Sequence, residues 1–406
     1  MKARNFFSAL ASSLLVVATT LTSCSINDGE GEYMSEESGK FAYSGLYDPS
    51  DPNGNGTVNG NTQAGIVTAG EWCDLTHWSF WSKLMLGEDY AEKSDYWKFY
   101  TNNRVAVKVT DASGNAVAGV PVTLKRGKAT LWEAVTDNHG LAECWVGLIQ
   151  KETADASNLN IAIDGQLMDG HPTLCQWDSL GQSTINEYVY TGASKVKQQA
   201  DIAFIVDATG SMSDEINFLK NDLDDIIVKV ASVRPDISMR TAALFYRDEG
   251  DDYLTRHSDF TTQLSDTQKF VSEQNADGGG DYPEAVHTAL EHMLKNLSWD
   301  NNARTRIAFM ILDAPAHYEN GIINSLQQSI QLCASRGIRL IPVAASGVDK
   351  NTEFMLRFFA IATGGTYVFL TNDSGVGLDH ITPTVGEYEV EQLNNLLIRL
   401  IDYYTE

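Results

Sequence analysis

The stretch Phe204-Ile-Val-Asp-Ala-Thr-Gly-Ser-Met212 decides the fold of the C-terminal half of this 406-residue chain. Residues 202–206 are all apolar, which is typical of a strand buried on both faces of a parallel sheet. After a short polar turn, apolar residues recur every three or four positions from Ile216 to Val230, which predicts a helix. A buried strand followed by a helix begins the alternation that is typical of an α/β domain.

The same alternation continues to the end of the chain. Further buried strands are predicted at 242–246, 307–312 and 340–344, a polar edge-like strand at 253–260, and helices at 326–334, 354–362 and 390–403. This order predicts an α/β fold over residues 200–406: a doubly wound, Rossmann-like, mostly parallel sheet with helices on both faces.

Oxygen-bearing side chains follow the predicted strands where they end. Asp207 comes directly after the first strand, Asp313 follows 307–312, and the Gly-rich loop 277–281 precedes a helix. In such sheets ligands gather at the carboxyl ends of the strands. Carboxylates and hydroxyls without His or thiolate favour a hard divalent cation, that is Mg²⁺, Ca²⁺ or Mn²⁺.

Two hydroxyls complete this candidate metal site. Thr209 and Ser211 lie two and four residues after Asp207, so a tight turn can aim both at one ion. Gly210 keeps that turn free of a side chain.

Residues 204–212 closely resemble the D-x-S/T-x-S metal-ion-dependent adhesion site of von Willebrand factor A domains, and the order of elements over 200–406 agrees with that family. By position, the resemblance implies that Asp207, Thr209 and Ser211 are metal ligands and that Asp313 is a direct or water-mediated one.

The chain departs from the family pattern in two loops. Asp281, in Gly278-Gly-Gly-Asp-Tyr-Pro-Glu284, stands where many members have Thr, and Asp313 is followed by Ala314 instead of Gly. We expect Asp281 to be an additional carboxylate ligand, which would neutralise more of the ion's charge. Tight or Ca²⁺-tolerant metal binding is then favoured over capture of a partner's acidic group.

Other polar residues near this edge allow two interpretations each. The turn 247–252 either extends the metal site, since Arg247-Asp248 resembles a pair found in bacterial A domains, or is an exposed charged hairpin on an edge strand. His317 and Tyr318 either line the top of the site or are ordinary surface residues. Pro283 and Glu284 are predicted to begin a helix.

The preceding part, residues 67–192, has a different pattern. Residues 105–109 and 120–124 alternate between apolar and polar, and turns at 111–114 and 136–140 separate the runs, which predicts an antiparallel β-sandwich. These runs resemble bacterial immunoglobulin-like or carboxypeptidase-regulatory-like domains, which implies a spacer. The aromatic residues at 67–100 either stack on sugars or, as we favour, pack against the adjacent sandwich.

The N-terminus predicts export and lipid anchoring. Lys2 and Arg4 precede an apolar stretch at 6–21, and Leu21-Thr-Ser-Cys24 resembles the lipobox of bacterial lipoproteins. We expect a signal peptide at 1–23, lipidation of Cys24, a flexible tether at 24–66, and a location in the bacterial cell envelope at the outer membrane, on its periplasmic or cell-surface face. The alternative is a plain signal peptide with an incidental Cys. No second apolar run is long enough to span a bilayer.

Four cysteines remain after Cys24. One disulfide among Cys73, Cys144 and Cys175 is plausible in an oxidising compartment, whereas Cys333 lies in an apolar helical pattern and is expected to be a buried free thiol.

Charge and motifs narrow the function. A net charge of −25 argues against a nucleic-acid partner. No HExxH, nucleophile elbow or P-loop is present, so an enzyme is not expected. The favoured function is metal-dependent adhesion to a protein, an extracellular matrix or a surface ligand, and the alternative is a scaffold of an envelope complex with a structural ion.

Overall fold

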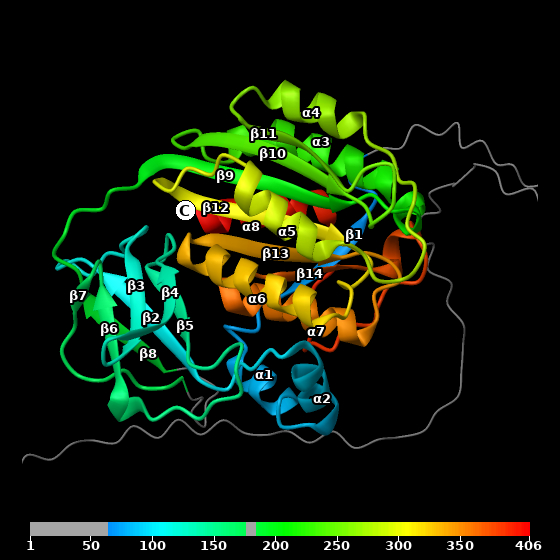
Figure 1. Ribbon diagram of the computed structural model, residues 1–406. Helices are drawn as coiled ribbons and strands as arrows, with labels where there is room; N and C mark the ends of the chain where they lie inside the picture. Colours follow the sequence, from blue (N-terminus) through cyan, green and yellow to red (C-terminus); the bar gives the residue numbers. More distant parts are fainter. Residues whose placement is uncertain (1–63, 176–183) are drawn as a thin grey trace, which may run out of the picture. The chain divides into compact units, whose positions relative to one another are not determined.

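The computed structural model describes residues 64–175 and 184–406. Its largest sheet has eight strands in the order β11-β10-β9-β12-β13-β14-β1-β15 (Figure 1). The neighbouring strands from β10 to β14 in this order all run parallel, and β11 (Thr255–Thr261) pairs antiparallel with β10 at one edge. The parallel strands are β9 (Lys197–Asp207), β10 (Ser238–Tyr246), β12 (Ala303–Leu312), β13 (Ile338–Ala344) and β14 (Tyr367–Leu370). The predicted mostly parallel sheet is confirmed.

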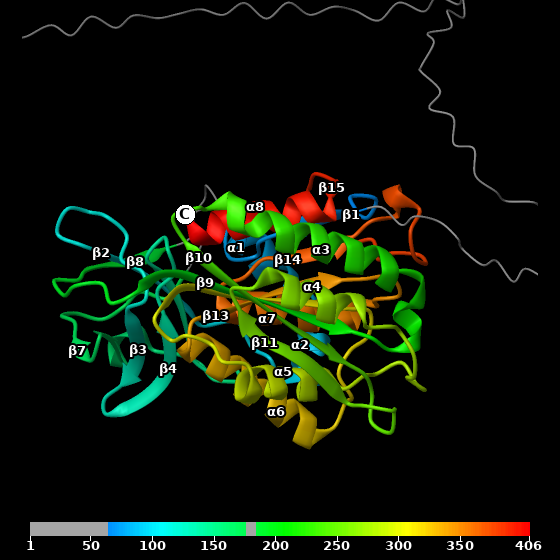
Figure 2. The same ribbon diagram turned by 90° about the horizontal axis from the view of Figure 1, so that it is seen from above.

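Helices cover both faces of this sheet. Ile202, Phe204 and Val206 of β9 lie in a core with α3 and α8, whereas Ala203 and Ile205 lie in a second core with α5, α6 and α7. Figure 2 shows α3 and α8 on one side of the sheet and α5 and α6 on the other. The helices are α3 (Ile216–Val233), α4 (Leu264–Ser272), α5 (Val286–Asn296), α6 (Asn320–Ser335), α7 (Lys350–Thr363) and α8 (Leu393–Thr405), with short 3₁₀ turns η1 (Ala156–Asn158), η2 (Gly210–Asp214) and η3 (Asn372–Ser374). This double burial explains the continuous apolar run of β9.

The far edge of the sheet is completed by a strand from the aromatic-rich segment. β1 (Thr68–Trp72) pairs antiparallel with β14, and β15 (Glu391–Gln392) pairs with β1. The sequence predicts a separate N-terminal part at residues 67–192 and does not predict this strand. The large sheet therefore contains one strand that precedes the small sheets in the sequence and several strands that follow them.

The rings of the aromatic-rich segment pack against α7. Two short helices follow β1, α1 (Trp78–Leu84) and α2 (Glu88–Trp97). Trp81 stacks on Phe354 with ring centroids 5.8 Å apart, and Phe99 stacks on Phe358 at 3.8 Å. Both rings of this segment are fully buried, so they serve packing and not sugar stacking.

Residues 104–189 form two small sheets. One is antiparallel, in the order β4 (Ala129–Val135), β3 (Pro121–Arg126), β6 (Leu159–Ile163), β7 (Gln166–Leu167). The other has the order β5 (Leu141–Trp145), β2 (Arg104–Thr110), β8 (Ile185–Val189), and here β2 and β8 run parallel. The predicted antiparallel sandwich is therefore not confirmed. An alternating pattern fixes which side chains face inward but does not fix the direction of a neighbouring strand.

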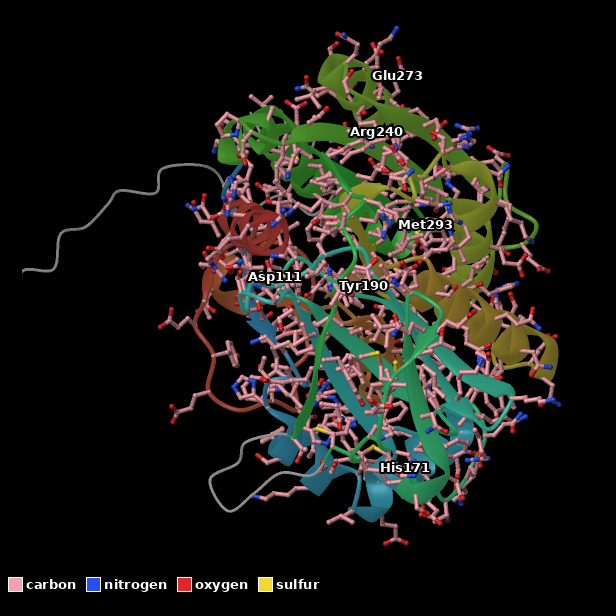
Figure 3. All side chains as sticks on the ribbon, turned by 90° about the vertical axis from the view of Figure 1, so that its left-hand side faces the viewer. Asp111, His171, Tyr190, Arg240, Glu273 and Met293 are labelled. Carbon is pink, nitrogen blue, oxygen red and sulfur yellow. The ribbon has the colours of Figure 1, made fainter. Side chains whose placement is uncertain are left out.

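The turn predicted after the first of these strands is present. The Asp111 carboxylate accepts hydrogen bonds from the backbone N–H groups of Ser113 and Asn115, at 2.8 and 2.9 Å. Figure 3 labels Asp111 at this turn. The Asp therefore stabilises the turn locally.

Cys73, Cys144 and Cys333 are free thiols in the described part of the chain. Cys144 pairs with Val105 in the ladder between β5 and β2, whereas the backbone N–H of Cys175 donates to Arg104 O of β2. Because Cys144 is a free thiol, the disulfide between Cys144 and Cys175 that the sequence allows does not form. Cys333 is fully buried, as expected.

The predicted signal peptide, Cys24 and nearly all of the tether lie outside the described residues. Within the described residues, no helix combines the length and the apolar character that a bilayer crossing needs.

A buried ion pair ties the aromatic-rich segment to α7. The side chain of Arg357 is fully buried, and its Nε and Nη2 donate to the carboxylate of Asp74 at 2.9 and 2.6 Å. Its Nη1 donates to the Tyr90 hydroxyl at 2.9 Å. Because both charges are out of water, each needs the other.

We expect Arg357→Leu to lower the free energy of unfolding by about 3–5 kcal/mol, because Asp74 would stay buried without its cation. Denaturant unfolding would measure the change. The matched control is Arg399→Leu, since Arg399 is half-exposed and pairs with Glu71 and Glu391. There we expect a loss under about 1 kcal/mol. Equal losses in the two variants would contradict this assignment.

Candidate functional site

Four of the predicted site residues meet at the carboxyl end of the central strands. Asp207 ends β9 and is fully buried, and Asp313 directly follows β12 and is 4% exposed. The backbone N–H and the hydroxyl of Thr209 donate to Asp207 Oδ1 at 2.9 and 2.7 Å. The Thr209 hydroxyl lies 3.2 Å from that of Ser211. Burial raises the pKa of Asp313, and the neighbouring Ser211 hydroxyl opposes part of that rise.

The fifth predicted residue, Asp281, does not join them. Its side chain is exposed, and no hydrogen bond or ion pair links it to another described residue. The acidic side chain that the same loop buries is Glu284, which is 3% exposed. The Glu284 backbone N–H donates to Pro315 O at 2.8 Å, so this loop is fastened to the one that follows Asp313.

Sequence reasoning therefore missed Glu284 as a site residue. The sequence predicts Glu284 at the start of a helix, and α5 does begin two residues later, at Val286. The available signal was an acidic residue placed directly before the apolar pair Ala285 and Val286, both fully buried. A carboxylate at such a position is drawn inward with its apolar neighbours.

The turn after β10 fastens the other loops. Arg247 is 7% exposed, and its Nε donates to Ala208 O at 3.1 Å and its Nη2 to Asn275 O at 2.9 Å. Asp248 pairs with His317 at 2.9 Å. Asp251 accepts a 2.9 Å bond from the backbone N–H of Gly279. Arg247 and Asp248 thus belong to the site's framework and not to an exposed hairpin.

A family model for the von Willebrand factor A domain matches residues 201–353. The chain contains a von Willebrand factor A domain. Such a domain indicates a protein-interaction module. The matched range covers Asp207, Thr209, Ser211, Asp281 and Asp313.

Two curated proteins are similar to part of the chain. The chain is 31% identical over 192 residues to an ariadne-like RING finger protein of Acanthamoeba polyphaga mimivirus, which covers 43% of this chain and 18% of that protein. It is 32% identical over 164 residues to the alpha-protein kinase vwkA of Dictyostelium discoideum, covering 40% of this chain and 25% of that protein. The chain thus spans a quarter or less of the length of these relatives.

Among solved structures, the conserved hypothetical protein BatB from Bacteroides thetaiotaomicron is similar, with 12% sequence identity and a TM-score of 0.35. The similarity covers 50% of this chain and 98% of that one.

The A-domain site buries negative charge without satisfying it. Asp207 Oδ2, Asp313 Oδ1 and Glu284 Oε2 are buried and have no hydrogen-bond partner. Burial and then the charge of Asp313 raise the pKa of Asp207 to about 7, and burial raises that of Asp313 to about 6. Burial and then Asp207, Asp248 and Asp313 raise the pKa of Glu284 to about 9. Buried, unpaired oxygens of this kind are costly unless protons or cations neutralise them.

This set of donors fits a hard divalent cation, because carboxylate and hydroxyl oxygens are the ligands such ions prefer. Within residues 64–175 and 184–406, however, no three or more His, Cys, Asp or Glu side chains stand together in an arrangement that could hold a metal ion. A cation here would thus depend on Asp207, Asp313 and the hydroxyls of Thr209 and Ser211. Glu284 does not complete a three-carboxylate cage in this arrangement.

The raised pKa values predict how the metal-free protein responds to pH. Asp207, Asp313 and Glu284 bind protons more tightly in the folded protein than in the unfolded chain. Their protonation therefore stabilises the fold fully below about pH 4, and this stabilisation is lost as the pH rises through about 6 to 9. We expect unfolding in EDTA to become easier over this range, by on the order of 2–4 kcal/mol. Thermal or denaturant melts at several pH values would measure it.

The matched variant is Asp207→Asn, which removes one buried titrating group and keeps its size. The loss of stability with rising pH should then be smaller. If Asp207→Asn and the native chain lose stability to the same extent, the buried carboxylates are not its cause.

Proposed function

We propose that the A domain binds a protein partner and that one divalent cation, held by Asp207, Thr209, Ser211 and Asp313, completes its binding face. The observation that carries the proposal is the set of buried carboxylate oxygens without partners at the carboxyl ends of β9 and β12. A bound cation would supply positive charge where the fold has collected negative charge.

The site is accessible from one side. Thr209 and Asp207 are fully buried, but Ser211 is exposed. An ion bridging these side chains would therefore have protein ligands on its inner side and open coordination positions toward solvent. This arrangement favours a binding role at the surface, and catalysis is not part of the proposal because the sequence offers no motif for it.

The alternative is a scaffold role in which the ion is structural. The carboxylates at the site favour it, because Asp207 and Asp313 together offset the charge of one divalent ion. An ion whose charge is already offset attracts a partner's acidic group less strongly. Dependence of partner binding on the ion separates the two functions.

The first experiment measures metal affinity. We expect Mg²⁺, Ca²⁺ or Mn²⁺ to raise the unfolding temperature and to bind in calorimetry, and Asp207→Ala to abolish both effects. We further propose that Glu284, buried in the loop next to the site, tunes the affinity for the ion without being one of its ligands. Glu284→Gln should then change the affinity about tenfold or more, whereas Asp281→Ala, in the same loop, should stay within about twofold.

Each outcome of this comparison decides something. A large effect of Asp281→Ala with none of Glu284→Gln would restore Asp281 as the ligand. No ion-dependent stabilisation of the native chain, at millimolar concentrations of all three ions, would refute the metal site.

The second experiment measures partner binding. Capture of envelope proteins by the native chain should require Mg²⁺ or Ca²⁺, be reversed by EDTA, and be lost with Asp207→Ala. Quantifying the captured proteins in the three conditions is the measurement. Capture that survives both chelation and the variant would refute the metal-dependent role and leave the scaffold role.

The lipid anchor at Cys24 and the envelope location, at the outer membrane, stay predictions from the sequence. They fit a domain that presents its binding face at the end of a long tether.

A further inference from the structure

Two exposed tyrosines stack beside the candidate site. The rings of Tyr96 and Tyr318 lie 3.8 Å apart between centroids and are nearly parallel, at 19°. Tyr96 is 38% exposed and Tyr318 is 47% exposed. Because each ring covers one face of the other, their exposed areas are the remaining faces and edges. We call this pair the aromatic ledge.

The two rings of the ledge are far apart in sequence, and one of them lies in the loop that follows Asp313. Tyr318 lies five residues after Asp313, in the loop before α6, whereas Tyr96 lies in α2. Trp97 packs edge-on against Tyr318 at 6.1 Å and donates its indole N–H to Asn351, the second residue of α7. The ledge is therefore fixed by buried contacts, which makes it a preformed platform.

Carboxylates predominate in the loops near the ledge, and the cation beside it, Lys98, donates to Asn320. Asp349 lies two residues before Asn351, which accepts the indole N–H of Trp97, so its carboxylate lies near the ledge. The four loops at this edge, residues 247–254, 273–285, 313–319 and 345–349, contain a single Arg and no Lys. That one, Arg247, is buried and engaged with backbone carbonyls. The exposed carboxylates of these loops are Glu249, Asp252, Glu273, Asp277, Asp281, Glu319 and Asp349.

We propose that the aromatic ledge takes an arginine side chain from a basic segment of a protein partner, with Asp349 as the counter-charge. The inference names the partner chemistry and rests on the proposed protein-binding role of this face. The guanidinium is planar and stacks on tyrosine faces, while its N–H groups remain free to reach a carboxylate at the ring edge. A partner's acidic segment would meet repulsion from the exposed carboxylates of these loops.

The test uses a seven-residue peptide of alternating Gly and Arg with blocked, labelled ends. Its binding to the full chain is measured by fluorescence anisotropy with Mg²⁺ present, next to peptides with Lys or citrulline in place of Arg. We expect the affinity order Arg, Lys, citrulline, and weaker binding of the Arg peptide at higher salt. Tyr96→Ala and Tyr318→Ala should each weaken the Arg peptide by about two- to fivefold.

Three matched variants control for other causes. Tyr318→Phe keeps the ring and should bind normally. Tyr388→Ala removes a tyrosine of similar exposure, 41%, from another loop, and should have no effect. Asp349→Asn removes the charge but preserves the cap that Asp349 gives to Thr352 at the start of α7, so it should weaken binding without loss of stability.

Equal affinity for the Arg and citrulline peptides, or native affinity in both alanine variants, would overturn the proposal. Metal affinity is measured on the same variants and should be unchanged in Tyr96→Ala and Tyr318→Ala, which also reports that they fold. If Asp207→Ala loses the ion yet still binds the Arg peptide, the ledge binds arginine independently of the ion. If the native chain binds the ion but has equal affinity for the Arg and citrulline peptides, the ledge proposal fails and the metal site stands.

Discussion

The position of β9 at the centre of the sheet sets the conditions for the rest of the molecule. From Ile202 to Val206 its side chains alternate between two separate cores, so neither face has room for a polar group there until the strand ends. Asp207 is that end, and it is fully buried. The fold thus brings a carboxylate to the boundary of its driest region, and β12 beside it delivers Asp313 in the same way. The loops at this edge therefore pack around two buried carboxyl groups, Asp207 and Asp313.

Two kinds of contact make that arrangement tolerable. The hydroxyl and the backbone N–H of Thr209 satisfy one oxygen of Asp207, while Arg247 fixes the turn by donating to Ala208 O. The hydrogen bond between Asp248 and His317 and the one from Gly279 N–H to Asp251 hold the neighbouring loops in place. The remaining oxygens have no such partners. A framework this firmly fixed cannot relieve the repulsion by relaxing, so it stays ready to accept positive charge.

The sequence predicts the parts of this site that depend on local order and misses those that depend on tertiary contacts. Asp207, Thr209 and Ser211 sit in one turn, and Asp313 follows a recognisable buried strand, so their convergence could be deduced. The loop 278–284 carries two acids, Asp281 and Glu284, and only packing against the loop after β12 decides that Glu284 turns inward. The Tyr96 contact could not be deduced either, because it brings together residues more than two hundred positions apart.

The fold shows the same division. Continuous apolar runs identify parallel strands, since burial on both faces leaves a clear signature. Alternating runs leave the direction of the partner open, which is why β8 is parallel to β2 where an antiparallel sandwich was expected. β1 is short and lies within an aromatic segment whose rings point to packing without saying against what. Only its register with β14 places it in the large sheet.

The placement of β1 also determines how the chain carries mechanical load. The strand that precedes the small sheets and the strands that follow them belong to one sheet, so the small sheets form a side loop in the connectivity. A pull applied between the N-terminal end of the described residues and the metal face enters at β1 and passes across β14, β13 and β12 to the site. The small sheets are bypassed, and the resistance to tension rests on the hydrogen bonds that join β1 to β14.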